Sequence, residues 1–170
     1  MRHLVFPLTV FCMLISTVNC SEPKKSDKAQ HVDLESIYEQ NVQDSILATG
    51  WYYIVDGENG FKRQIDKQDE FYFIDPKPIV VKEHFDKLEI YKTNIQGSHC
   101  FALSIRIGEK YKDLWANATE KSIGKRLGLI VDNKLLSAPM VNMRIENGMS
   151  SLIRSDYDKK ELEAFKKLME

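Results

Sequence analysis

Short runs of apolar residues, separated by turn-forming residues, recur along the chain from position 50 onward. Runs of this kind that are rich in Val, Ile and aromatic residues predict strands. By this criterion we expect strands over residues 51–55, 61–65, 70–74, 88–93, 100–107, 127–131, 134–136, 141–145 and 149–153. The Asp-Pro-Lys-Pro run at 75–78 predicts an extended break, because proline donates no ladder hydrogen bond and restricts the residue before it.

Apolar residues at helical spacing predict helices between these strands. One such stretch covers residues 32–49, and a single short helix is expected over 81–86. A further helix begins at Gly108 and ends before Gly124, with its apolar side made by Tyr111, Leu114, Trp115 and Ala118. Together with the strands on either side, this helix resembles a βαβ unit.

A terminal helix carries Leu162, Phe165, Leu168 and Met169 on one side. Ser155 followed by Asp158 resembles a capping box at its start. Short strands at hairpin spacing, interrupted by single helices, are typical of α+β domains. We therefore expect residues 32–170 to form one α+β domain, with an antiparallel-rich sheet and helices packed on one face.

The stretch 125–152 contains the densest series of turn signals. Asp132-Asn133 suits a two-residue hairpin loop, in which Asn133 adopts a positive φ and glycine should substitute freely. Ser137 and Pro139 end the returning strand, because proline cannot donate to a ladder. Gly148 marks the next turn. We interpret these five residues as structural turn residues and not as catalytic groups.

Residues 1–19 have the pattern of a signal peptide, with Arg2 and His3 before an apolar run. The run ends in Thr-Val-Asn-Cys, which is similar to a bacterial lipoprotein box and predicts lipid attachment at Cys20. The alternative is a plain secreted protein or an uncleaved anchor. Residues 20–31 are polar and contain three lysines, which predicts a flexible tether to the membrane.

The cysteine count agrees with this interpretation. Cys12 leaves with the signal peptide and Cys20 carries the lipid, so only Cys100 remains and no intrachain disulfide is expected. Cys100 lies in a predicted strand, without the basic or helix-N-terminal surroundings that lower a thiol pKa. We expect it to act as a small core residue.

Composition and motifs exclude several classes of function. With 43% hydrophobic residues in 170, the chain can bury one core, and the net charge of −1 without clustered basic residues disfavours nucleic-acid binding. The sequence has no His pair at metal-ligand spacing, no phosphate-binding loop and no nucleophile elbow. Asp132 and Asp156 sit where turns and helix starts favour aspartate. We expect no metal, no cofactor and no enzyme.

Two aromatic runs, at 51–53 and 71–73, leave two interpretations open. Most aromatic side chains in strands pack in the core or against neighbouring strands. The alternative is an aromatic platform that binds an extended chain.

The run Ile-Gly-Lys-Arg-Leu-Gly-Leu-Ile-Val-Asp-Asn-Lys-Leu-Leu-Ser-Ala-Pro at 123–139 resembles a segment of the P1 head of the SecD/SecDF protein-export subunit. The lead-in from Asp69 to Asn94 is also similar, so the resemblance covers about residues 69–169. Asn147-Gly148 stands where the family tends to carry two glycines.

The resemblance implies a P1-head-like fold that faces the periplasm and contacts extended or exported polypeptides. In the family, the proton path lies in transmembrane helices, and no apolar segment of spanning length follows position 18 here. The motor function is therefore not transferred. Together with the predicted lipid site at Cys20, the resemblance favours a lipid-anchored binding module of the bacterial envelope. The alternatives are a structural or assembly lipoprotein that docks to a folded membrane protein, and a hydrolase, which the missing site motifs disfavour.

Overall fold

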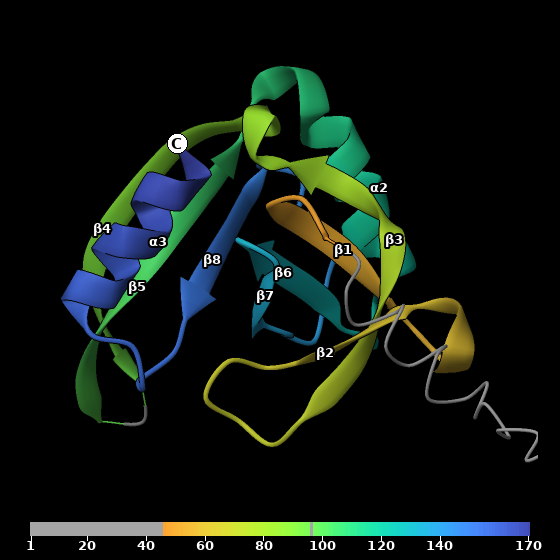
Figure 1. Ribbon diagram of the computed structural model, residues 1–170. Coiled ribbons are helices and arrows are strands. Elements are labelled where there is room, and N and C mark those ends of the chain that lie inside the picture. Colours follow the sequence, from red (N-terminus) through yellow and green to blue (C-terminus); the bar gives the residue numbers. More distant parts are fainter. Residues whose placement is uncertain (1–45, 96) are drawn as a thin grey trace, which may run out of the picture. The chain divides into compact units, whose positions relative to one another are not determined.

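Two antiparallel sheets carry the fold in the computed structural model, which describes residues 46–95 and 97–170 (Figure 1). These residues belong to one compact unit, Asp33–Glu170. The expected signal peptide, the lipid site at Cys20, the tether and most of the helix over 32–49 lie outside the described residues.

The larger sheet, sheet A, has five strands in the order β2-β3-β1-β6-β7, and the smaller, sheet B, has three in the order β4-β5-β8. The strands are β1 (Gly50–Val55), β2 (Phe61–Gln64), β3 (Phe71–Val81), β4 (Phe85–Ile95), β5 (Ser98–Ile107), β6 (Leu127–Val131), β7 (Lys134–Ser137) and β8 (Met149–Ile153). The helices are α2 (Lys112–Lys121) and α3 (Lys159–Met169), with 3₁₀ turns η1 (Gly57–Asn59), η2 (Lys82–His84) and η3 (Glu109–Tyr111). The expected antiparallel-rich α+β fold is confirmed, with its strands divided between two sheets.

Sheet A is buried on both faces at β6, which explains the continuous apolar run of this strand. All five residues of β6 are buried. Because side chains alternate along a strand, Trp51 and Leu129 enter the larger core, whereas Tyr52 and Ile130 enter a smaller cluster on the other face. The larger core also contains Leu152 of β8 and joins the two sheets.

The helices close this larger core. Trp115 and Ala118 of α2, and Leu162 and Met169 of α3, are buried in it. α3 packs against β4 and β5, and α2 against β3 (Figure 1). The cap of α3 is Asp158 with Glu161, each accepting a hydrogen bond from the other's backbone N–H, so the cap begins three residues later than the expected one at Ser155.

The hairpin between β6 and β7 is built on Asp132 and Asn133, with φ of 49° and 62°. The Asn133 Oδ1 accepts hydrogen bonds from the backbone N–H of Leu47 and from Nη2 of Arg63, both at 3.0 Å. The Asp132 N–H donates to Oγ1 of Thr49 at 3.1 Å. The hairpin therefore holds the segment that leads into β1, and this explains why residues 46–49 are not helical as expected.

The expected break at 75–78 is wrong, because β3 continues through both prolines. β2 pairs with β3 only from Phe71 to Ile74, so Pro76 and Pro78 lie in the part of β3 that has β1 as its one partner strand among the described residues, with Pro78 opposite Tyr52. Register shifts around Tyr52 in the pairing with β1 absorb the irregularity. The expected helix over 81–86 is only the 3₁₀ turn η2.

Two further expectations are wrong. The expected βαβ unit does not exist, since β5 belongs to sheet B and β6 to sheet A. The expected strand over 141–145 is a loop, with bridges only at Met140 and Val141. Its backbone is held by other groups, because the Gly124 N–H donates to the Val141 carbonyl at 2.8 Å and the Ile145 N–H to Oγ1 of Thr119 at 2.9 Å.

Candidate functional site

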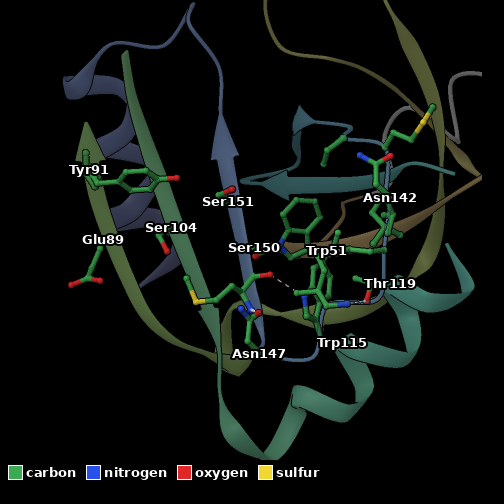
Figure 2. Close-up of a pocket in the computed structure, with 18 residues that line it drawn as sticks. Trp51, Glu89, Tyr91, Ser104, Trp115, Thr119, Asn142, Asn147, Ser150 and Ser151 are labelled. Atoms are coloured by element: carbon green, nitrogen blue, oxygen red, sulfur yellow. Dashed lines mark hydrogen bonds between the residues drawn. The ribbon is translucent and has the colours of Figure 1, made fainter. Parts of the chain in front are cut away.

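A cleft of about 850 Å³ is lined by both sheets, α2 and the loop over 139–147 (Figure 2). Trp51 comes from β1, Trp115 and Thr119 from α2, and Ser104 and Ser151 from β5 and β8. The remaining lining residues are Glu89, Ile90, Tyr91, Leu127, Pro139, Met140, Val141, Asn142, Met143, Ile145, Asn147, Met149 and Ser150.

One side of the cleft is a polar row across sheet B. Glu89 is opposite Ser104, which in turn is opposite Ser151. The neighbouring positions Leu103 and Leu152 are fully buried in the core. Since successive side chains point to opposite faces of a sheet, the polar row lies on the face turned away from the core, and its serine hydroxyls face the cleft.

The facing side is aromatic. The rings of Trp51 and Trp115 lie 5.4 Å apart between centroids, tilted by 50°. The Nε1 of Trp115 donates a hydrogen bond to the carbonyl of Met149 at 3.2 Å. Thr119, which is fully buried, accepts from the backbone of Ile145 and so holds the loop against α2. The aromatic side is thereby fixed to both the loop and β8.

Some of the side chains that line this cleft are apolar and exposed to solvent. Met140 is 52% exposed, Met143 68% and Tyr91 40%. Methionine is unbranched and polarizable, so methionine-lined surfaces adapt to partners of different shape. The cleft therefore combines a fixed aromatic side with adaptable apolar groups.

β8 is an edge strand of sheet B, and its free edge is beside the cleft. The Gly148 carbonyl accepts from the Ile107 N–H of β5 at 2.8 Å. Because hydrogen-bonded and non-hydrogen-bonded pairs alternate in an antiparallel ladder, Ser150 and Leu152 also turn their backbone groups toward β5. Met149 and Ser151 consequently turn theirs toward the free edge.

Arg154 closes the end of β8. Its Nη1 donates to the Leu136 carbonyl at 2.7 Å and its Nη2 to the Asp66 carbonyl at 2.8 Å, and it pairs with Asp156. Burial works toward a higher pKa of the Asp156 carboxyl, but the Arg154 guanidinium outweighs it and lowers the pKa. Burial raises the pKa of Tyr157, whose hydroxyl donates to the Asp66 carboxylate at 3.0 Å.

A second ion pair supports the same corner of the molecule. Lys67, at φ 61°, lies 2.5 Å from Oε1 of Glu161 and donates to the Asp156 carbonyl at 2.9 Å. The pKa of Glu161 is lowered by the Lys67 hydrogen bond and by the backbone of Asp158. The loop after β2 is thus joined to the start of α3.

The predicted turn residues are distributed over several places, and Pro139 alone of these five lines the cleft. Asp132 and Asn133 form the hairpin loop, Ser137 ends β7, and Gly148 has φ 68° beside the start of β8. The lipid site at Cys20 lies outside the described residues. Over residues 46–95 and 97–170, no three His, Cys, Asp or Glu side chains gather as metal ligands.

The aromatic runs divide between the two interpretations. Trp51 lines the cleft. Tyr52 is buried in the smaller cluster, where burial raises its pKa to about 12 although its hydroxyl donates to the Ala48 carbonyl at 2.7 Å. Phe71 is 54% exposed on β3. Cys100 is a half-buried free thiol on β5.

Sequence reasoning missed Met140, Met143 and Ser151. The two methionines were assigned to a strand and its flank, where an apolar residue suggests core packing. Two features of the sequence could have indicated a loop here. Residues 141–145 have no neighbouring run with which to form a hairpin, and Asn142 and Asn147 lie within and just after this stretch.

Comparison with known families decides the relationship of this chain. The model of the SecDF P1 head subdomain matches residues 58–170. The chain belongs to this family. The resemblance predicted from residues 69–169 is thereby confirmed, and it extends further toward the N-terminus. The search of curated proteins found no match to this chain.

Solved SecDF structures share the fold at low sequence identity. A crystal structure of SecDF in the super-membrane-facing form matches with a TM-score of 0.57 and 10% identity, over 81% of this chain and 20% of that chain. A structure of SecDF as a membrane component that enhances protein export matches with a TM-score of 0.54 and 11% identity, over 81% of this chain and 68% of that one. This chain therefore corresponds to a fifth of the first protein. In the described part of the chain, no helix has the length and apolar character needed to cross a membrane.

Proposed function

We propose that this protein is a non-enzymatic binding module of the bacterial cell envelope that contacts extended or exported polypeptides. Its membership of the P1 head family supports a role related to protein export, since the family's head is the periplasm-facing part of an export subunit. The whole SecDF machine is not implied, because this chain matches only a part of it.

The observation that carries the proposal is the cleft. A site for unfolded chains must accept many side chains while holding a common main chain. Exposed Met140 and Met143 supply adaptable apolar contact. The serines of the polar row on sheet B line the same cleft and supply polar partners. A catalytic site would instead require several titratable side chains that converge on the substrate. Among the described residues, Glu89 is the one acidic side chain that lines this cleft.

The proposal includes a lipid anchor. The signal-like residues 1–19, the box ending at Cys20 and the polar residues 20–31 support a module held on the membrane surface and facing the periplasm. A tether of that composition lets the head approach chains that emerge at the membrane. No catalytic group, metal or cofactor enters this role.

The alternative is a structural lipoprotein that docks to a folded membrane protein. Phe71 of β3, Leu114 of α2 and Leu168 of α3 are exposed apolar side chains, and a docking surface would require such residues to form one contiguous patch.

Binding to an unfolded and a folded form of one protein separates the two functions. The probe is a reduced, carboxymethylated protein that stays unfolded, and its native form is the control. We expect the purified head to bind the unfolded form and to ignore the native form, measured by fluorescence anisotropy. Equal binding of both forms, or of neither, would contradict the proposal.

A further inference from the structure

The free edge of β8 carries backbone groups that no neighbouring strand uses. Met149 is already satisfied there, since its N–H donates to Oδ1 of Asn147 at 3.0 Å and its carbonyl accepts from Trp115. Ser151 also faces this edge, and within residues 46–95 and 97–170 β8 pairs only with β5. The N–H and C=O of Ser151 are therefore available to a ligand that enters the cleft.

A second donor lies in the same cleft. The Trp51 side chain is 2% exposed, and its Nε1 is buried without a hydrogen-bond partner among the described residues. A buried N–H without an acceptor is rare and costs free energy. Figure 2 draws the ring beside β8, near Ser150 and Ser151, with its nitrogen on that side. The carbonyl of a ligand bound in the cleft would supply the acceptor that this nitrogen lacks.

We infer that an extended peptide binds in the cleft as an added strand on the free edge of β8, with one of its carbonyls accepting a hydrogen bond from Trp51 Nε1. Strand addition satisfies the Ser151 N–H and C=O with main-chain groups that every peptide possesses. Recognition is then independent of guest sequence, while alternate guest side chains contact Met140 and Met143.

The structure also sets the position of the guest strand. At one end of β8, the Trp115 indole and the Asn147 side chain occupy the edge groups of Met149. At the other end, Arg154 reaches across to the Leu136 carbonyl of β7. Main-chain pairing is thus centred on Ser151, between these two contacts.

This inference rests on the proposed function, and a set of three labelled peptides tests it separately. The first alternates threonine and valine between terminal lysines. The second carries backbone N-methyl groups on every second residue, which block one edge of the strand. The third carries them on every residue, which blocks both edges. The second peptide is the matched control, because rotation about its axis still presents an open edge.

We expect the first two peptides to bind with similar affinity and the third to bind about tenfold more weakly, the equivalent of one or two lost hydrogen bonds. The third binding as tightly as the first would overturn strand addition while leaving peptide binding intact. No binding of the first peptide would contradict the proposed function itself, and with it this inference.

The two indole N–H resonances report on the second donor. When ¹⁵N-labelled protein is saturated with the first peptide, the Trp51 indole resonance should move downfield as a new hydrogen bond forms. The Trp115 indole N–H already donates to the Met149 carbonyl, so its resonance serves as the internal reference. Replacing Trp51 site-specifically by benzothienylalanine, which keeps the ring shape and lacks the N–H, should weaken binding about threefold to tenfold. A stationary Trp51 resonance, or unchanged affinity of this variant, would overturn the role of Trp51.

Discussion

The indole nitrogen of Trp115 on α2 donates a hydrogen bond to the carbonyl of Met149 on β8, over 3.2 Å. α2 packs against sheet A and β8 is the edge of sheet B, so this bond joins the two sheets at one end of the cleft. Arg154 joins them at the other end through the Leu136 carbonyl. These two contacts hold sheets A and B together on either side of the centre of β8.

Trp115→Phe should lower the free energy of unfolding by about 2–3 kcal/mol, because the Met149 carbonyl loses its donor and the buried ring becomes smaller. Urea denaturation followed by circular dichroism measures the change. Leu114→Ala, at the exposed neighbouring position, is the matched control and should change the value by less than about 0.5 kcal/mol. An unchanged midpoint for Trp115→Phe would show that the bond does not hold the sheets together.

Asn133→Gly should destabilise the protein by about 1–2 kcal/mol, since the Asn133 side chain accepts from Leu47 and Arg63. This corrects the expectation from sequence that glycine substitutes freely here, which considered φ alone. Asn133→Val should cost more, about 2–4 kcal/mol, because left-handed strain adds to the lost hydrogen bonds.

Asp132→Gly is the comparison for this position. It relieves a φ of 49° and keeps the backbone N–H that donates to Thr49, so it should be neutral or stabilising by a few tenths of a kcal/mol. The order of midpoints in chemical denaturation should be Asp132→Gly, Asn133→Gly, Asn133→Val, from most to least stable. An Asn133→Gly variant as stable as Asp132→Gly would mean that the hydrogen bonds of Asn133 contribute little.

Acid should weaken the ion pairs that Arg154 and Lys67 make with Asp156 and Glu161. The pKa values of Asp156 and Glu161 are lowered in the fold, by Arg154 and by Lys67. A lowered pKa stabilises the fold above the unfolded value, near 3.8 for Asp and 4.5 for Glu, and this stabilisation is lost as pH falls through the folded value. We expect the Tm of the Asp156→Asn, Glu161→Gln variant to fall less than that of the wild type below about pH 4.5. Parallel curves for both proteins would contradict the assignment.

The anchor has its own test. Cys20→Ala should abolish labelling of the protein by a palmitate analogue in bacterial cells, because the acyl chains of a lipoprotein are attached through this cysteine. Cys100→Ala is the matched control and should leave labelling unchanged. Labelling that persists without Cys20 would exclude the lipid anchor and leave a secreted protein or an uncleaved anchor.

Local signals in the sequence predict much of the fold. Asp132-Asn133 between two apolar runs indicates the turn between β6 and β7. The spacing of Tyr111, Leu114, Trp115 and Ala118 predicts the buried side of α2 correctly for Trp115 and Ala118, but Leu114 is exposed. Sheet membership is not a local property. The sequence around β5 and β6 suggests a βαβ unit, and only tertiary packing places these strands in different sheets.

The candidate site was harder to predict because its parts are far apart in sequence. Trp51, Met143 and Ser151 come from β1, a loop and β8. The loop was mistaken for a strand, since its alternating pattern arises from Val141 and Ile145 packing toward the core while Met143 points to solvent. Alternation alone does not distinguish a strand from a loop held by side chains such as Thr119.

Photocrosslinking from the cleft tests whether extended polypeptide binds there. p-Benzoylphenylalanine is placed at Met143 or, as the control, at exposed Lys160 on α3, and each protein is irradiated with the unfolded carboxymethylated probe. We expect a crosslinked product from position 143 that excess unlabelled probe removes, and none from position 160. Equal crosslinking from both positions, or none from position 143 while the probe still binds, would show that extended polypeptide is not held in this cleft.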